Sequence, residues 1–414
     1  MLKVVVSTLV LMASGTAGRP AAPAAHAPRA HIQATPGTSE PRSAAAIVAN
    51  RAKDALSARL LRAAMGGNAE EVRSALAAGA DIESTSESGS TALALAAVHG
   101  HTAIVNLLLS AGANPSAADT SGATPLFVAA SEGHVAALDA LAARGANLDA
   151  RDKEGLTPLI AAASANRLEA IRWLLGHGAR VDVASKGGGT AVMAAAFGGY
   201  SEAVQLLIAR GANVNVTDES NRTPLMAAAR AGSAPAVQAL ITAKANLTAE
   251  DNAGSTALTF AAVSLHAPIM DLLEKAGLRK GGEMGLIFAA GNCGTDIVKK
   301  LVSRGISVRV QRNDTTAVLQ AAAAGCLDTL RYLLANGADA NAKDKKGVTA
   351  LMEAATTGSA PVVELLLNAG ADLEAETLDG ETAWRRATML GDREVVDVFK
   401  KAREKRASTS PQSR

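Results

Sequence analysis

The side chains that could carry catalysis are few and dispersed along the 414-residue chain. It has seven histidines. His99, His177 and His266 have no Ser, Cys or carboxylate at the fixed offsets that nucleophilic or acid–base catalysis requires. The sequence therefore predicts a protein that is not an enzyme.

Two other patterns associated with ligand sites are incomplete. Gly187-Gly188-Gly189 has the composition of a phosphate-binding loop, but the Lys-Ser/Thr pair that completes such a loop does not follow it. Asp339 and Asp344 lie in turns without the alternating oxygen ligands of a calcium loop. Two cysteines cannot form a four-cysteine zinc site or a disulfide framework. We expect no metal and no cofactor.

Composition and charge restrict both the partner and the architecture. The chain has 41 Lys and Arg against 39 Asp and Glu, whereas nucleic acids and anionic membranes require a concentrated basic surface. We therefore expect no nucleic acid as a partner. Apolar residues make up 48% of the chain, but aromatic residues only 2%. A core of small side chains lets backbones approach closely, which favours stacked helices over a β-sandwich.

The first residues have the layout of a secretory signal peptide. Lys3 precedes an apolar run over residues 4–12, and small residues fill positions 13–17. The run is too short for a membrane span, which takes about 20 residues. We predict a signal peptide over residues 1–17, an Ala/Pro-rich linker over residues 18–45, and no membrane span. The chain is then exported to the periplasm or secreted, and its high Ala, Gly and Arg content favours a bacterial source.

After the linker the chain repeats with a period of 33 residues. A threonine recurs at this spacing in two runs: Thr91, Thr124, Thr157, Thr190, Thr223 and Thr256, then Thr316, Thr349 and Thr382. Ala58 and Met284 take the threonine position in two further units, which makes eleven units over residues 55–403. Such a period is the sequence signature of stacked repeats. Residues 404–414 remain as a basic tail that we predict to be disordered.

Each unit predicts a helix, a turn, a second helix and an extended hairpin. In the unit that begins at Thr124, the threonine is a helix N-cap and Pro125 takes the first helical position, where its missing N–H costs nothing. Gly133 and Gly145 end the two helices, because glycine suits the left-handed conformation that follows a helix. Asp152 opens the hairpin turn. One unit cannot bury its apolar side alone, so the units must stack.

The period fails at one place. Met284 follows Thr256 by 28 residues and precedes Thr316 by 32. The missing residues fall where the hairpin should be, and Lys244 replaces the glycine that ends a second helix one unit earlier. We predict a weak joint near residues 278–284.

The order of helix, turn, helix and hairpin, opened by Thr-Pro-Leu, resembles the ankyrin repeat family. Gly100-His101 and Gly133-His134 match the Gly-His turn of that family. The resemblance implies an all-α repeat fold, an ankyrin-type solenoid of about eleven helix-turn-helix units joined by β-hairpin-like fingers.

The sequence departs from the family at the histidine of the Thr-Pro-Leu-His motif. Apolar side chains take that position at Phe127, Ile160, Met193, Met226, Leu319 and Met352. We predict that they form a buried stripe in place of a hydrogen bond between neighbouring units. A methionine-rich binding groove is the alternative.

The resemblance also implies a concave face made by the first helices and the hairpin tips. The candidate partner-binding residues are Val98, His99, Glu132, Phe197, Arg230, Val263 and Met389 on the helices, and Lys153, Glu154 and Arg222 at the hairpins. An apolar centre at Phe197 within a rim of both charges favours a protein partner.

The leading functional interpretation is a non-catalytic protein–protein interaction module. It is an exported, monomeric ankyrin solenoid that binds a protein on its concave face. Two alternatives remain open. One is a secreted effector or inhibitor that acts on a host or competitor protein. The other is a structural spacer without a specific ligand.

The two cysteines, Cys293 and Cys326, lie at the turns between helices of adjacent units. Their positions within the repeat differ by one residue. An oxidising compartment would let them pair. A disulfide needs Cα atoms within about 7 Å, whereas stacked helices lie about 8–10 Å apart. The sequence leaves their pairing open.

Overall fold

The structure of the protein is a computed structural model, which describes residues 44–278 and 281–409. The predicted signal peptide, and the predicted linker up to residue 43, lie outside the described residues. The described chain is a succession of eleven helix pairs. None of these helices is both long enough and apolar enough to cross a membrane.

The chain divides into two compact units, which we describe separately. One consists of Met1–Ala195 with Leu206–Asn213, and the other of Ala196–Gln205 with Val214–Arg414. The division falls within the pair formed by α10 (Ala191–Phe197) and α11 (Ser201–Ala209).

The helix pairs before α10 belong to the first unit. They are α2 (Ala44–Gly66) with α3 (Ala69–Ala77), α4 (Ala92–Val98) with α5 (Thr102–Ser110), α6 (Pro125–Glu132) with α7 (Val135–Ala142), and α8 (Pro158–Ser164) with α9 (Leu168–Gly176).

The pairs after α11 belong to the second unit. They are α12 (Pro224–Ala231) with α13 (Ala234–Thr242), α14 (Ala257–Val263) with α15 (Ala267–Lys275), α16 (Gly282–Gly291) with α17 (Thr295–Ser303), α18 (Ala317–Ala323) with α19 (Leu327–Ala335), α20 (Ala350–Thr357) with α21 (Ala360–Asn368), and α22 (Ala383–Leu390) with α23 (Arg393–Thr409).

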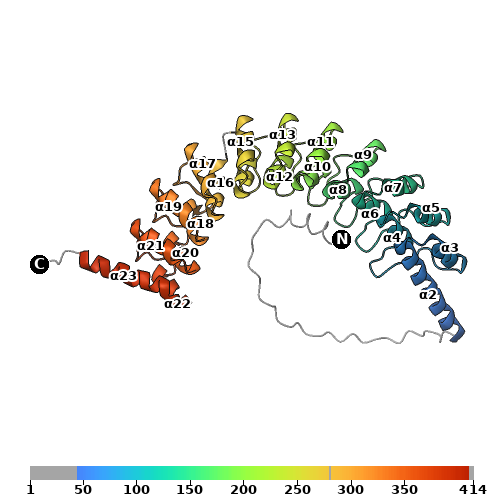
Figure 1. Cartoon of the computed structure of the whole chain (residues 1–414), viewed down its shortest axis with the longest axis horizontal. Coiled ribbons are helices and arrows are strands. Elements are labelled where there is room, and N and C mark those ends of the chain that lie inside the picture. The colour runs from blue at the N-terminus through green and yellow to red at the C-terminus, as the bar shows by residue number, and fades with distance from the viewer. Residues whose placement is uncertain (1–43, 279–280, 410–414) are drawn as a thin grey trace. The chain divides into compact units, whose positions relative to one another are not determined.

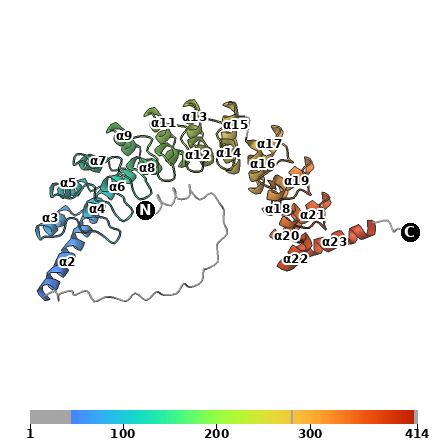
Figure 2. The same ribbon diagram turned by 180° about the vertical axis from the view of Figure 1, so that it is seen from behind.

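Within each unit the helices form two layers. First helices pack on first helices, as α4, α6 and α8 do in the first unit and α12, α14 and α16 in the second (Figure 1). Second helices form the other layer, as α5, α7 and α9 do. The view from behind shows the same two rows, with the first helices on the inner side of each unit (Figure 2). The first helices and fingers are therefore the side on which each unit can enclose a partner.

Threonine side chains start the first helices, as the sequence predicts. Thr91 Oγ1 accepts a hydrogen bond from the N–H of Ala94 at 3.3 Å, which satisfies one unpaired amide of the first turn. The same cap occurs at Thr124, Thr157, Thr223, Thr316, Thr349 and Thr382. Gly133 ends α6 in the left-handed conformation, with φ of 83°.

Small side chains fill the space between the layers. The paired alanines of the first helices, such as Ala129 and Ala130, are fully buried. The residues that replace the family histidine are buried as well: Phe127, Ile160, Met193, Met226, Leu319 and Met352 are each at most 6% exposed. The sulfur of Met226 accepts a hydrogen bond from the N–H of Thr223 at 3.4 Å. The stripe is part of the core, so the alternative of a methionine-rich groove is wrong.

Short fingers, rather than long strands, connect one pair to the next. Within the described residues the regular strands are β1 (Gln311–Arg312) and β2 (Thr315–Thr316), which pair antiparallel. Backbone hydrogen bonds join one finger to another: the N–H of Lys153 donates to Ser121 O at 2.8 Å. These bonds align successive fingers within a unit.

The pair α16–α17 departs from the predicted pattern at its start. Met284, which takes the capping position in the sequence, lies inside α16 and is 7% exposed. The N-cap is Gly281, whose carbonyl accepts a hydrogen bond from Thr259 Oγ1 at 2.9 Å. The helix starts early because almost no finger separates it from α15. The weak joint near residues 278–284 stays a prediction, and residues 279 and 280 lie outside the described residues.

Both ends of the array are more helical than predicted. At the N-terminal end, α2 begins at Ala44, within the predicted linker. At the C-terminal end, α23 continues to Thr409, so residues 404–409 of the predicted disordered tail are helical. The guanidinium carbon of Arg403 lies 4.7 Å from the Trp384 ring centroid, and its Nη2 donates to Glu374 Oε1 at 3.1 Å. These contacts hold α23 against the preceding helix and finger, which explains the longer helix.

Candidate functional site

The first two candidates of the first unit lie at the end of α4. Val98 is half-buried, and its carbonyl accepts a hydrogen bond from His134 Nε2 at 3.2 Å. His99 is exposed, and its ring lies 5.9 Å from that of His101. Val98 therefore serves the packing of neighbouring pairs, whereas His99 faces solvent and can meet a partner.

Glu132, at the end of α6, is also engaged within the unit. Its carboxylate accepts a hydrogen bond from Arg167 Nη2 at 3.1 Å. Arg167 belongs to the next pair, and its Nε donates to Ser131 O at 3.0 Å. A half-exposed ion pair of this kind contributes about 1 kcal/mol or less. Glu132 can still accept from a partner, but its position is set by Arg167.

Lys153 and Glu154 form an exposed finger tip in the first unit. The Asp152 carboxylate beneath them accepts the N–H groups of Glu154 at 2.9 Å and Leu156 at 2.8 Å. Burial raises the pKa of Asp152, although the two N–H bonds oppose that shift. The tip is thus built on a half-buried carboxylate, and it presents one charge of each sign.

The second unit brings two predicted residues together. Phe197 ends α10 and is half-buried, and Arg230, near the end of α12, is exposed. The guanidinium carbon of Arg230 lies 5.6 Å from the centroid of the Phe197 ring. This is within the cation–π range of about 6 Å. An aromatic ring beside an arginine is the composition that interface hot spots favour.

Arg222 and Val263, in the same unit, are less accessible than the sequence suggests. Arg222 is half-buried, and its N–H donates to Asp218 Oδ1 at 2.8 Å. Val263 is half-buried, and its carbonyl accepts from Asn292 Nδ2 at 2.8 Å. Both residues are therefore held by hydrogen bonds within the second unit.

Two apolar side chains of the second unit were missed by the sequence reasoning. Phe288 in α16 is 38% exposed, and Leu265 in the turn after α14 is 41% exposed. Phe288 follows the threonine position by four residues, as the half-buried Phe260 does one pair earlier. Aromatic residues at that position in adjacent units were the available signal.

Met389 lies near the end of α22 and is 74% exposed. Leu390 beside it is 59% exposed, and Leu378 on the preceding finger is 81% exposed. The last pair therefore exposes three large apolar side chains, of which the sequence singled out one.

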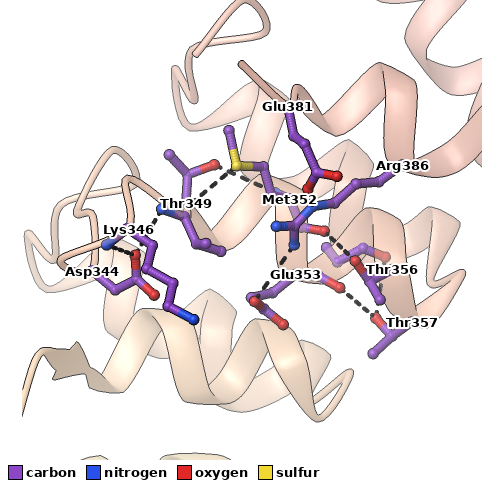
Figure 3. Close-up of polar contacts among 11 residues, drawn as sticks. Asp344, Lys346, Thr349, Met352, Glu353, Thr356, Thr357, Glu381 and Arg386 are labelled. Atoms are coloured by element: carbon purple, nitrogen blue, oxygen red, sulfur yellow. Dashed lines mark hydrogen bonds and ion pairs between the residues drawn. The ribbon is translucent and has the colours of Figure 1, made fainter. Parts of the chain in front are cut away.

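Polar side chains of α20, α22 and the finger before each helix form hydrogen bonds and ion pairs within the unit (Figure 3). Arg386 of α22 lies between two carboxylates, with Nε 3.3 Å from Glu381 Oε2 and Nη1 3.8 Å from Glu353 Oε1. The hydroxyls of Thr356 and Thr357 donate to backbone carbonyls of their own helix, at 2.9 Å to Met352 O and at 3.2 Å to Glu353 O. These groups are satisfied within the unit, which makes this part a weaker anchor than Phe197 and Arg230.

An open cleft of about 630 Å³ lies where the finger before α16 is shortened. Glu250, Gly254, Glu283 and Arg312 are among the residues that line it. Arg312 Nε donates to Glu283 Oε2 at 2.5 Å. The shortened finger thus leaves a charged recess between the fingers on either side.

Cys293 and Cys326 are joined by a disulfide, with their Cα atoms 5.1 Å apart. The spacing of helix axes does not apply to them, because both lie in turns at the helix ends, where backbones of adjacent pairs approach more closely. In the described part of the chain, no three His, Cys, Asp or Glu side chains cluster in a way that could hold a metal ion.

A family model described as "Ankyrin repeats (3 copies)" matches residues 60–152, 141–218, 192–281, 272–344 and 319–407. No curated protein sequence matches significantly. The crystal structure of the human ASB11 ankyrin repeat domain is one of 518 chains of solved structures that match. It is 22% identical, with a TM-score of 0.46, over 51% of this chain and 96% of that one.

Proposed function

The chain belongs to the ankyrin repeat family, and from that membership we propose that it is an exported, non-catalytic module that binds a protein partner on the inner side of its second unit. Ankyrin repeats are generally protein–protein interaction modules and typically non-catalytic. Family membership does not identify the partner, so the binding site has to be inferred from the chemistry of particular side chains.

The observation that carries the proposal is the Phe197–Arg230 contact. A half-buried aromatic ring is positioned beneath an exposed guanidinium, 5.6 Å from its centroid. The contact places an aromatic ring and a positive charge side by side, and both residue types are enriched in protein interfaces. Phe288, two pairs farther along the first-helix layer from Arg230, is a further exposed aromatic side chain. Phe197, Arg230 and Phe288 form the proposed anchor patch.

The test is affinity capture with the mature chain from a periplasmic extract, followed by measurement of the affinity for the captured protein. We expect F197A/R230A to weaken binding by about 30-fold or more, because truncating one hot-spot residue typically costs at least about 2 kcal/mol and the costs of two contacting residues do not add in full. Binding that is unchanged by this double substitution would place the site elsewhere.

The control is Q205A/Q238A, which alters exposed residues on the second helices α11 and α13 of the same two pairs. It should leave binding and thermal unfolding unchanged. If the unchanged chain and both variants retain no specific protein, the structural-spacer alternative is favoured. If the partner occurs only in host or competitor cells, the effector alternative is favoured.

Export is the second part of the proposal. It is supported by the arrangement of Lys3, the apolar run over residues 4–12 and the small residues up to Ala17. The Cys293–Cys326 disulfide adds support, because disulfides persist in oxidising compartments. We expect the protein isolated from its source to begin near Gly18. A protein that retains its first residues in the cytoplasm would contradict export.

A further inference from the structure

Neighbouring helix pairs are held together at the turn between the two helices of each pair. Gly100 is the left-handed residue of the α4–α5 turn, with φ of 71°. The ring of His134, from the next pair, lies against Gly100, and its Nε2 donates to Val98 O at 3.2 Å. We call this contact the turn clasp: a side chain of one pair rests on the left-handed residue of the previous pair and bonds a carbonyl near it.

The turn clasp recurs with different chemistry. Arg167 Nε donates to Ser131 O at 3.0 Å in the first unit. Ser233 Oγ donates to Gly199 O at 2.9 Å in the second. The contact is therefore a position in the repeat, and several side chains can fill it with one hydrogen bond.

The disulfide occupies this position. Cys293 is the left-handed residue of the α16–α17 turn, with φ of 55°. Cys326 follows Gly325, as His134 follows Gly133. Its sulfur lies 4.0 Å from Gly291 O, the carbonyl that corresponds to Val98 O. A covalent bond has thus replaced the hydrogen bond of the turn clasp.

The pair so fastened, α16–α17, is the one whose preceding finger is shortened. On its other side the turn clasp is reversed. Leu265 is the left-handed residue, with φ of 59°, and its side chain packs over Gly294. Asn292 Nδ2 supplies the hydrogen bond, to Val263 O at 2.8 Å. The helix pair with the shortest preceding finger is therefore the one that the disulfide links to its neighbour.

We propose that the Cys293–Cys326 disulfide is a redox-sensitive clasp that fastens α16–α17 to α18–α19 and that a dithiol reductant opens through Cys293. Cys293 is exposed, whereas Cys326 is 4% exposed. This proposal is independent of the anchor patch and of the identity of the partner.

The exchange follows from that difference in exposure. A thiolate of the dithiol attacks Cys293 Sγ, the S–S bond breaks, and Cys326 leaves as a thiolate that takes up a proton. The second thiol of the reductant then attacks the mixed disulfide and releases Cys293. Two electrons pass from the dithiol to the protein, and the dithiol becomes a disulfide.

Opening the clasp removes the covalent constraint on a sequence separation of 33 residues. The reduced Cys326 thiol, 4.0 Å from Gly291 O, is only a weak donor, so it replaces poorly the hydrogen bond that His134 or Arg167 supplies elsewhere. We expect the helices around the clasp to open locally while the first unit is unaffected, since each pair of a solenoid contacts only its neighbours.

The experiment is backbone hydrogen exchange on the full mature chain, oxidised and after treatment with dithiothreitol. Amides of α17 and α18 should exchange about tenfold faster or more after reduction, whereas those of α5 and α7 should not change. Equal exchange in the oxidised and reduced protein would overturn the proposal, and this comparison needs no variant that might fail to fold.

A matched variant, C293G/C326H, replaces the disulfide with the Gly–His form of the turn clasp. It should protect α17 and α18 better than C293S/C326S and be insensitive to dithiothreitol. If the Gly–His variant exchanges as fast as the serine variant, the cysteines do not act as a turn clasp and the proposal is wrong.

Discussion

The pairs α6–α9 and the pairs α14–α17 meet their neighbours by different means. In the first region the fingers are complete, and the N–H of Lys186 donates to Glu154 O at 2.9 Å across them. In the second region a cleft of about 630 Å³ occupies the place of a full finger. Both regions pack first helix on first helix, but only the first region is also joined by backbone hydrogen bonds between complete fingers.

In the second region, charged side chains join one second helix to the next. Arg304, the C-cap residue of α17, donates from Nη2 to Asp271 Oδ1 of α15 at 3.0 Å, and Lys300 forms an ion pair with the same carboxylate. Lys300 Nζ also donates to Ala267 O at 3.2 Å. In the first region, the link between second helices is a single bond from Trp173 Nε1 to Asp139 Oδ1 at 2.5 Å. The shortened finger is thus accompanied by ion pairs, whose strength depends on salt and pH, and by a disulfide, which depends on redox state. The backbone hydrogen bonds between complete fingers do not share these dependences.

Substitution of two glycines in the first region measures how much the turn clasp contributes to stability. Gly100 and Gly112 are both left-handed, with φ of 71° and 94°. A Cβ at Gly100 would lie 2.6 Å from His134 Nδ1, whereas at Gly112 it would meet nothing within 4 Å. We expect G112A to cost about 1 kcal/mol of unfolding free energy from backbone strain. G100A should cost about 2–3 kcal/mol, because it also displaces the clasp. Urea unfolding measures both.

The control for this prediction is the double substitution G100A/H134A. Once the ring is removed, the added cost of G100A over G112A should disappear, which a double-mutant cycle reveals. If G100A and G112A cost the same in the otherwise unchanged chain, the turn clasp contributes nothing to stability.

Limited trypsin digestion measures the difference between the complete fingers and the shortened one. Lys280 lies at the shortened finger, and Lys153 and Lys186 lie at complete ones. We expect cleavage near Lys280 about tenfold faster than at the other two, because the complete fingers are held by backbone hydrogen bonds. Fragment masses identify the sites. A chain that is first cut at Lys153 or Lys186 would contradict the weak joint.

Local signals explain why the regular part of the fold could be predicted. Thr91 and Thr124 cap helices because each needs only its own first turn, and Gly133 is left-handed because its own helix ends there. None of these features depends on another repeat. The periodicity then places eleven copies of the same unit in register.

The features that escaped prediction depend on contacts between pairs. The distance of 5.1 Å between the Cα atoms of Cys293 and Cys326 follows from where adjacent turns lie, not from the spacing of helix axes. The helical tail follows from the contact of Arg403 with Trp384. Phe288 is exposed because the surrounding side chains do not cover its ring. In each case the residue type was visible, but the surrounding residues decided its role.

The smallest expected effect concerns the ion pairs of the second region. The hydrogen bond from Lys300, with added attraction from Arg304, lowers the pKa of Asp271 below its ordinary value of 3.8. Its stabilisation is therefore present above pH 3.8 and is lost as the pH falls through the lower pKa of the folded state. The Asp271 side chain is 47% exposed, so solvent screening limits the contribution to about 0.5 kcal/mol. Urea unfolding of D271N should show this loss at pH 7, none in about 1 M salt, and a shrinking difference from the unchanged protein as the pH falls below 3.8. A loss that persists in high salt would mean that Asp271 acts through packing rather than charge, and the second region would then resemble the first more closely.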